Sequence, residues 1–335
     1  MNKIIYAWGF LVISTIFFSG CTPKVGVKAL EPAEIDRVAN TKRIAITNFS
    51  NDRVGLAAKI EAKLAKFQID NKKYFTVISR NDLDKVIAEQ KLQNSGLVDD
   101  KTVVKLGKIV GAQAIISGRV SSPTKQDSYF YEERIRCKDL KCKEIVTYAV
   151  RCVKRVFSLS AELKIVDVAK TDIIYADTID KGSMYKHCAD DSQALPSTEM
   201  AAQNLANQIA DSFTYKLTPH YRQFDVELLD DEDIDYTDSE EKLLKVSLEY
   251  IKQGRYDKAQ QLLTRLIDET DEKSYVPFYN IGVIKEAQGK YEEAKEYYQH
   301  ADHLMIEPVE EINKAVLRID KLIEKRKKTM EQLNR

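Results

Sequence analysis

The stretch Phe157-Ser158-Leu159-Ser160-Ala161-Glu162-Leu163-Lys164-Ile165 decides the fold of the first part of this chain, because apolar and polar residues alternate through it without a break. Alternation with a period of two is typical of a β-strand with one buried face. The chain then turns at Ala169-Lys170-Thr171 and returns through a second strand-like run, from Ile173 to Ile179. We therefore predict an antiparallel pair of strands with its turn centred near Lys170.

The segments around this pair switch between strand-like and helix-like patterns. Arg43–Phe49 alternates like a half-buried strand, whereas Leu56–Ile69 carries apolar residues at helical spacing. The remaining predicted elements are strands at Tyr74–Ile78 and Ala114–Gly118, helices capped by Asn81 and Asp100, a stop at Gly111, and a final amphipathic helix from Ala202 to Leu217. This order predicts an α/β fold in which helices pack on a mixed sheet.

The C-terminal part of the chain contains one short signature twice, Gly-x-Tyr-x-x-Ala, beginning at Gly254 and at Gly289, about 35 residues apart. This period, with apolar residues at helical spacing around it, is typical of tetratricopeptide (TPR) repeats, an all-α helical-repeat fold. Small residues let paired helices approach closely, and larger ones fill the space between them. The residues predicted to pack the repeats are Tyr250, Gly254, Tyr256, Ala259, Gly282, Gly289, Tyr291 and Ala294.

Two positions depart from the repeat pattern, because Ser247 replaces a small glycine and Lys285 replaces an aromatic residue. The binding groove of the repeats is therefore expected to be atypical. After Pro308, a further amphipathic helix is predicted to cap the open end. Two repeats plus a cap lie near the lower limit of stability for a repeat array, so docking on the first block or on a partner is expected.

The N-terminus has the order of a secretory signal: Met1-Asn2-Lys3, an apolar run from Ile4 to Phe18, and small residues before Cys21. The run is shorter than the roughly 20 apolar residues of a membrane-spanning helix. Phe18-Ser19-Gly20-Cys21 resembles the bacterial lipobox, with Phe18 where leucine is usual. The resemblance implies a lipid on Cys21, which would anchor the protein stably. Thr22, rather than Asp, follows the cysteine, and this resembles the pattern of lipoproteins that are sorted to the outer membrane. A cysteine near an ordinary cleavage site is the alternative.

An acidic stretch separates the two blocks. The predicted boundaries are a signal peptide at 1–20, a lipidated tether at 21–39, an α/β domain at 40–222, an acidic linker at 223–241, and TPR repeats with a capping helix at 242–335. The run Asp230-Asp231-Glu232-Asp233 has enough carboxylates to suggest calcium, but it lacks the glycine and the spaced oxygen ligands of an EF-hand loop. A solvated linker is the better interpretation.

Four cysteines follow Cys21, and an exported protein reaches a compartment in which disulfides persist. Zinc binding is the alternative, but the spacing lacks paired Cys-x-x-Cys knuckles. Residues opposed across a hairpin have numbers with a constant sum, so a turn centred near Lys170 places Cys152 opposite Cys188. Cys137 and Cys142 flank four residues that suit the mouth of a second hairpin. Opposed positions lie within bridging distance, so we predict the disulfides Cys137–Cys142 and Cys152–Cys188.

Composition and histidine placement argue against catalysis. A formal net charge of +0 leaves no nucleic-acid footprint, and 44% hydrophobic residues suffice for packed cores. His187 and His220 fit no Ser/His/Asp or Cys/His arrangement. His300 and His303 are three apart on a helix but lack a third ligand nearby, so we expect exposed positions rather than a metal site. No glycine-rich phosphate loop is present. We predict no enzyme, no metal site and no cofactor.

Five ordered segments carry a family resemblance: Ile44–Phe49, Val77–Arg80, Glu89–Gly96, Leu106–Ala112 and Val166–Thr171. They resemble the periplasmic domain of the CsgG-like curli assembly/transport lipoproteins, over roughly Arg43 to Leu217. The resemblance implies a binding and assembly role with self-association. Related domains also occur in lipoproteins that activate cell-wall synthases and in flagellar-ring components, so the fold alone does not choose a function.

The resulting hypothesis is a non-enzymatic outer-membrane lipoprotein that faces the periplasm, forms a homo-oligomer, recruits a protein partner through its TPR repeats and binds no nucleic acid. The alternative is a ring-forming secretion channel subunit like the curli pore, in which each subunit inserts hairpins into the outer membrane.

The channel alternative depends on the segment between Ser121 and Arg155. Its predicted apolar face is formed by Tyr129, Tyr131, Ile135, Val146, Tyr148 and Val150. A spanning strand needs about 9 to 11 residues with such alternation. However, Glu133 and Glu144 interrupt this face, and the polar stretch Lys181–Pro196 is too short to supply a second hairpin. We therefore predict a protein that conducts no ions.

Overall fold

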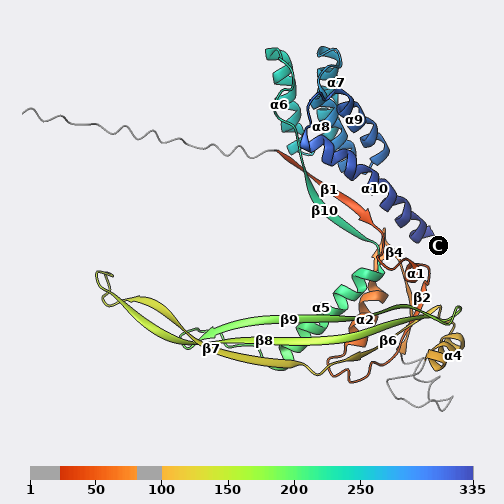
Figure 1. Ribbon diagram of the computed structural model, residues 1–335, viewed down its shortest axis with the longest axis vertical. Helices are drawn as coiled ribbons and strands as arrows, with labels where there is room; N and C mark the ends of the chain where they lie inside the picture. The colour runs from red at the N-terminus through yellow and green to blue at the C-terminus, as the bar shows by residue number, and fades with distance from the viewer. Residues whose placement is uncertain (1–22, 81–99, 335) are drawn as a thin grey trace, which may run out of the picture. The chain divides into compact units, whose positions relative to one another are not determined.

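The computed structural model describes residues 23–80 and 100–334 (Figure 1). The chain divides into two compact units: the helical unit, which is Met1–Ala29 with Arg222–Glu324, and the α/β unit, which is Leu30–Tyr221 with Lys325–Arg335. The predicted signal peptide, the lipobox with Cys21 and the predicted helix capped by Asn81 lie outside the described residues. The family-like segment Glu89–Gly96 also lies outside them.

The α/β unit is built on one mixed sheet, as the sequence pattern predicts. β2 runs parallel to both its neighbours, β5 and β6, while β8 runs antiparallel to β6, β7 and β9. In sheet order the strands are β5 (Thr76–Ile78), β2 (Arg43–Ile46), β6 (Ala114–Val120), β8 (Ile145–Asp167) and β7 (Thr124–Cys137), with β9 (Asp172–Cys188) also on β8.

Helices cover both faces of this sheet. α2 (Leu56–Lys66) and α5 (Thr198–Leu217) pack with Ile44 and Ile46 of β2 in one core, and α4 (Asp100–Val110) packs with Ala45 in the other. Because successive side chains of a strand point to opposite faces of the sheet, β2 contributes residues to both cores. The remaining short elements of the unit are α1 (Asp36–Ala39), β3 (Gln68–Ile69) and β4 (Lys72–Lys73).

The structure differs from the predicted tether and linker. β1 (Lys24–Glu31) and β10 (His220–Glu227) pair as a two-stranded ribbon, and they lie side by side in Figure 1. Val25 and Val27 of β1 are buried in the core of the helical unit, together with Val226 of β10. The alternation in β1 is short and rests on small residues, which makes it a weak signal of a strand.

The helical unit contains two helix pairs and a further helix. These are α6 (Asp238–Lys252), α7 (Tyr256–Glu269), α8 (Tyr275–Ala287), α9 (Tyr291–Leu304) and α10 (Glu310–Asn334). α6 begins at a capping box in which Thr237 and Glu240 exchange hydrogen bonds. The last residues of α10, from Lys325, belong to the α/β unit, so the predicted domain boundary at 242–335 differs from the structure. None of the helices in the described ranges is long and apolar enough to cross a membrane.

Candidate interaction surfaces

The glycines of the repeat signature occupy positions that require glycine. Gly254 and Gly289 have φ of 73° and 74°, in the left-handed region that L side chains rarely adopt. Gly282 lies against Tyr298, where an added Cβ atom would be 2.5 Å from a ring carbon. Among the other predicted packing residues, Ala259, Tyr291 and Ala294 are buried, and Tyr250 and Tyr256 are half-buried.

The two residues that depart from the pattern are accommodated by local hydrogen bonds. Ser247 is fully buried and donates its hydroxyl to the Leu244 carbonyl at 2.6 Å. Lys285 is buried, and its ammonium pairs with Glu293 of α9 at 2.7 Å. Both substitutions thus remain inside the repeat without leaving an unpaired polar group.

A buried ion pair joins α10 to the second repeat, and it was not recognised from the sequence. Glu286 of α8 is 0% exposed and accepts hydrogen bonds from Arg318 Nε at 2.8 Å and Nη2 at 2.9 Å. The Tyr298 hydroxyl donates to the same carboxylate at 2.6 Å. Burial, together with the charge of Glu286, raises the pKa of Tyr298 well above its ordinary value. Three side chains far apart in the sequence therefore satisfy one another.

The predicted acidic linker is bound to α8 over part of its length. We call residues Leu228–Tyr236 the strap. The buried Asn280 amide donates to the Leu229 carbonyl at 2.8 Å and accepts from the Leu229 N–H at 3.0 Å. The Asp233 carboxylate accepts from the Tyr275 N–H at 2.6 Å, at the start of α8. Asp230, Asp231 and Glu232 are exposed, so only part of the acidic run is solvated.

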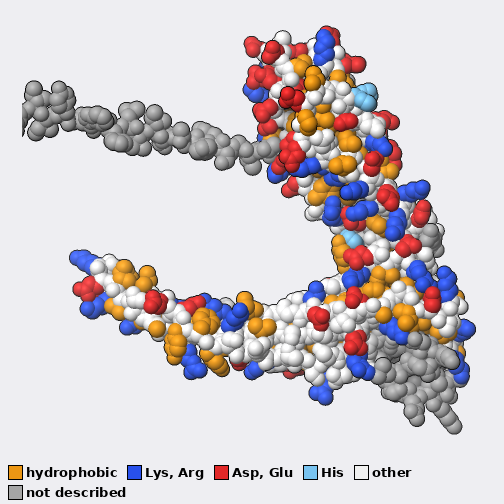
Figure 2. Space-filling view, viewed as in Figure 1, with side chains coloured by type: hydrophobic (Ala, Val, Ile, Leu, Met, Phe, Trp, Pro, Cys, Tyr) orange, Lys and Arg blue, Asp and Glu red, His pale blue; other side chains and the backbone are white. Residues whose placement is uncertain are grey.

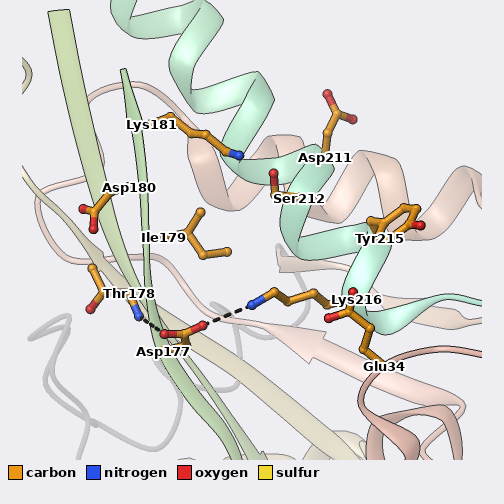
Figure 3. Close-up of a pocket in the computed structure, with 10 residues that line it drawn as sticks. All are labelled: Glu34, Asp177, Thr178, Ile179, Asp180, Lys181, Asp211, Ser212, Tyr215 and Lys216. Atoms are coloured by element: carbon orange, nitrogen blue, oxygen red, sulfur yellow. Dashed lines mark hydrogen bonds and ion pairs between the residues drawn. The ribbon is translucent and has the colours of Figure 1, made fainter. Parts of the chain in front are cut away.

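A pocket of about 580 Å³ lies between α5 and β9 in the α/β unit (Figure 3). Lys216 reaches across it to Asp177 at 3.1 Å, and this hydrogen bond lowers the pKa of the Asp177 carboxyl. Asp180 accepts from the Ser160 hydroxyl, and Asp211 pairs with Lys63. These three carboxylates are engaged with neighbours, so the pocket presents a mixed polar wall. It is lined by Glu34, Asp177, Thr178, Ile179, Asp180, Lys181, Asp211, Ser212, Tyr215 and Lys216.

β7 and β8 extend beyond the part of the sheet that α2 and α5 cover (Figure 1), and we call residues 129–137 and 145–153 the arm. The predicted register of the arm is wrong by three residues, because Cys137 pairs with Ile145 and not with Cys142. Asp139 accounts for the difference: its carboxylate accepts from the Lys141 and Lys143 N–H groups and holds a wider loop than a tight turn. An odd shift exchanges the two faces of a strand.

The exposed apolar residues of the arm therefore form a different face from the predicted one. Tyr129, Tyr131, Ile135 and Ile145 share a face, and their exposed fractions are 63%, 72%, 70% and 61%. Figure 2 shows hydrophobic and basic side chains intermingled along this part of the molecule. The predicted partners Val146, Tyr148 and Val150 lie on the opposite face.

That opposite face is closed by polar contacts with Asp190 and Asp191, which follow β9. Arg134 pairs with Asp190 at 3.0 Å and with Asp191 at 3.2 Å, and the Tyr148 hydroxyl donates to Asp190 at 3.0 Å. Hydrogen bonding from the Cys188 N–H, together with Arg134, holds the pKa of the Asp191 carboxyl below its usual range. The two faces of the arm thus differ in whether the chain itself covers them.

Both predicted disulfides are present. Cys152 and Cys188 are opposed in the register, with Cα atoms 3.9 Å apart, as the turn near Lys170 predicts. β9 consequently continues to Cys188 rather than ending near Ile179, so the first half of the stretch Lys181–Pro196 is strand. Cys137 and Cys142 are joined across the loop, with Cα atoms 4.7 Å apart, although they are not opposed strand positions.

The histidines lie on three different elements: His187 on β9, His220 on β10, and both His300 and His303 on α9. His300 and His303 are exposed on α9, as predicted, and the His300 ring stacks on Phe278 at 5.4 Å. Among the described residues, one group has metal-ligand types close together, Glu132 with Cys152 and Cys188, but both cysteine sulfurs are already bonded to each other. This group is a disulfide with a neighbouring carboxylate.

The fold and these surfaces define a class of protein: an α/β domain with a long-stranded mixed sheet, followed by TPR helical repeats. A comparison with protein families agrees, since the family described as curli production assembly/transport component CsgG matches residues 20–189, and a tetratricopeptide repeat matches residues 277–302. The first match covers half of the chain, and the chain belongs to the CsgG family. No curated protein matches it.

Several solved structures are similar to parts of the chain. The C-terminal domain of LpoB from Salmonella enterica matches with 13% identity over 44% of this chain and 92% of that one, at a TM-score of 0.26. Lipoprotein GNA1162 from Neisseria meningitidis matches with 16% identity over 50% and 98%, at 0.25. The hypothetical protein CT253 from Chlamydia trachomatis matches with 10% identity over 53% and 98%, at 0.29.

Proposed function

We propose that this chain is a non-enzymatic scaffold lipoprotein of the bacterial outer membrane, which assembles through its α/β unit and binds a protein partner through its helical unit. The observation that carries the proposal is the union, in one chain, of a CsgG-family domain with a TPR repeat. Stacked helical repeats present extended surfaces for other proteins. The CsgG family is described as an assembly/transport component, which fits a binding role rather than turnover.

The disulfides support export of the chain. Cys137–Cys142 and Cys152–Cys188 would persist in the periplasm, whereas a cytosol keeps thiols reduced. In this proposal, a lipid on Cys21 anchors the protein and leaves both units facing the periplasm. Two or three acyl chains, at roughly 0.8 kcal/mol per buried methylene, suffice for stable anchoring.

The second candidate function is the ring-forming secretion channel subunit. The exposed Tyr129, Tyr131 and Ile135 on one face of the arm favour it. Glu133 lies between these residues on the same face, and Arg151 is opposite Tyr131, so the face carries charges of both signs. These charges weigh against burial of the whole face in lipid.

Two measurements test the proposal. Mass spectrometry of the mature protein should find a lipid on an N-terminal Cys21, and Cys21→Ala should leave an unprocessed or mislocalised precursor; an unmodified mature N-terminus at another residue refutes the anchor. Negative-stain images of detergent-extracted protein should show assemblies, and the same preparation should give no stepwise conductance in planar bilayers. Reproducible large steps that are lost on deletion of Tyr129–Val150 would establish the channel instead.

A further inference from the structure

The strap is hydrogen-bonded along α8, the first helix of the second repeat. Leu229 is held by both hydrogen-bonding groups of the Asn280 amide, and the Tyr279 hydroxyl donates to the Glu227 carbonyl at 2.8 Å, two residues earlier. All three contacts are made to the main chain of the strap or of β10. Asn280 and Tyr279 therefore bind an extended backbone, as a neighbouring strand would, while the Leu229 side chain packs against the core of the helical unit.

The Asn280 amide is 0% exposed beneath the strap. Removing Leu229 without a replacement would take away both hydrogen-bond partners of this amide. The site thus favours an occupant with an extended backbone, and the chain supplies its own.

Asp233 provides the side-chain specificity of the strap. Ser274 precedes α8 as its N-cap residue but makes no side-chain cap of its own. Asp233 replaces that cap, because its carboxylate accepts from the Tyr275 N–H at 2.6 Å and from the Ser274 hydroxyl at 2.5 Å. A negative charge at this point also complements the helix macrodipole. An occupant therefore needs a carboxylate four residues after the residue that Asn280 holds.

Space remains beside β10 for a competing segment to begin binding. A cavity of about 230 Å³ borders Tyr279 and is also lined by Glu227 of β10 and Arg318 of α10. Its wall carries both signs of charge, because Asp225 and Glu311 line it together with Lys24 and Lys314, and Lys24 pairs with Glu227 at 2.8 Å. A partner could contact this cavity before the strap leaves.

We propose that the strap is a built-in ligand of the helical unit, which the extended acidic peptide of a partner protein displaces by offering an apolar residue followed four positions later by Asp or Glu. This inference rests on the proposed function, in which the helical unit binds a protein, and it names the surface and the chemistry of that partner. Because the strap is tethered, its effective concentration at the groove is about millimolar, so a free peptide competes poorly until the strap is weakened.

The test uses the full-length protein and a fluorescent peptide of its own sequence, Asp225–Tyr236, acetylated and amidated. Asp233→Asn weakens the tethered strap but leaves the groove residues Ser274, Tyr275 and Asn280 intact. Anisotropy should show that this variant binds the peptide about tenfold or more tightly than the wild type does. Asp231→Asn is the matched control, because Asp231 is an exposed neighbour of the same chemistry, and it should bind like the wild type. Equal binding by all three proteins overturns the proposal.

Hydrogen exchange of the wild type provides a second test that needs no substitution. The Leu229 amide, which donates to Asn280, should exchange about tenfold or more faster than those of β10 and α8, through a local opening. If the strap and α8 exchange together at one rate, the strap is a permanent part of the fold and the proposal fails. Neither readout requires a cellular partner, so these two tests can fail while the proposed function stands. The proposed function fails instead if the protein is not anchored, does not assemble or captures no partner.

Discussion

The face of α8 that contacts the strap and the face of the arm that carries Tyr131 and Ile135 both present side chains suited to binding, yet the chain covers only the first. On α8, the strap satisfies the buried amide of Asn280 and caps the helix through Asp233. On the arm, Tyr131 and Ile135 are 72% and 70% exposed. At α8, polar side chains bind the main chain of the strap, and leaving such groups buried without hydrogen-bond partners is costly. The exposed apolar face of the arm leaves no buried polar group unpaired, so it costs less to leave uncovered. The difference suggests a self-occupied site in one unit and an open one in the other.

The largest effect on stability is expected from loss of the ion pair between Glu286 of α8 and Arg318 of α10. Glu286→Ala leaves the half-buried Arg318 guanidinium and the buried Tyr298 hydroxyl without their acceptor, and breaking a fully buried pair costs about 3–5 kcal/mol, so a loss of up to about this size is expected. Urea unfolding followed by circular dichroism should show this loss. Glu292→Ala, at an exposed position on α9, is the control and should have little effect. A urea midpoint for Glu286→Ala equal to that of the control would mean that this ion pair does not stabilise the helical unit.

The disulfides are expected to have unequal effects on the arm. Removing Cys152–Cys188, which joins residues 36 apart, should cost about 3–4 kcal/mol, while removing Cys137–Cys142, only five apart, should cost about 2 kcal/mol, because chain entropy lost on cross-linking grows with loop length. Paired Cys→Ser double variants, compared by urea midpoints under oxidising conditions, measure the difference. A larger loss from the Cys137 and Cys142 variant would contradict the chain-entropy argument.

The sequence predicted what depends on local periodicity. Alternation around Leu163 gave the sheet, and the repeated glycines at Gly254 and Gly289 gave the helical repeats, because each signal lies within a few residues. The Cys152–Cys188 pairing also followed from counting along the strands from a turn near Lys170, and the structure reaches this register through a bulge next to Val166.

The contacts that close the surfaces could not be predicted in the same way. Asp233 and Tyr275 are 42 residues apart, and no pattern near either one indicates the other. The register of the arm depended on the side chain of Asp139, whose hydrogen bonds widen a loop that residue counting treated as a tight turn. Long-range polar contacts are chosen by the assembled fold, so periodicity carries no information about them.

A smaller and pH-dependent effect is expected where Lys42 is held inside the α/β unit. Its ammonium donates to the Gln332 carbonyl at 2.8 Å and lies over the Tyr74 ring, and burial lowers its pKa to about 8. The unfolded chain, with the ordinary lysine pKa of 10.5, binds more protons above pH 8, so Lys42 contributes stability that rises with pH from about 8.

Tyr74 limits the upper end of this window. Burial raises its pKa above the ordinary value of 10.0, so its contribution falls once the pH passes that value. Urea midpoints measured between pH 8 and 10 should therefore rise more steeply for the wild type than for Lys42→Met. Parallel slopes for the two proteins would mean that Lys42 titrates normally in the folded state.

The smallest effect on stability, and the sharpest test of the open side, is expected from the arm. Tyr131→Ser with Ile135→Ser removes exposed side chains, so the free energy of unfolding should change by less than about 0.5 kcal/mol per site. If a second copy of the chain covers this face in the proposed assembly, the double variant should sediment as smaller species than the wild type. Met184→Ser is the control, because Met184 is 62% exposed on the opposite face of the same sheet. Unchanged sedimentation of the double variant would mean that assembly leaves this face free, and the contrast with α8 would then reflect only the cost of leaving a buried amide unpaired.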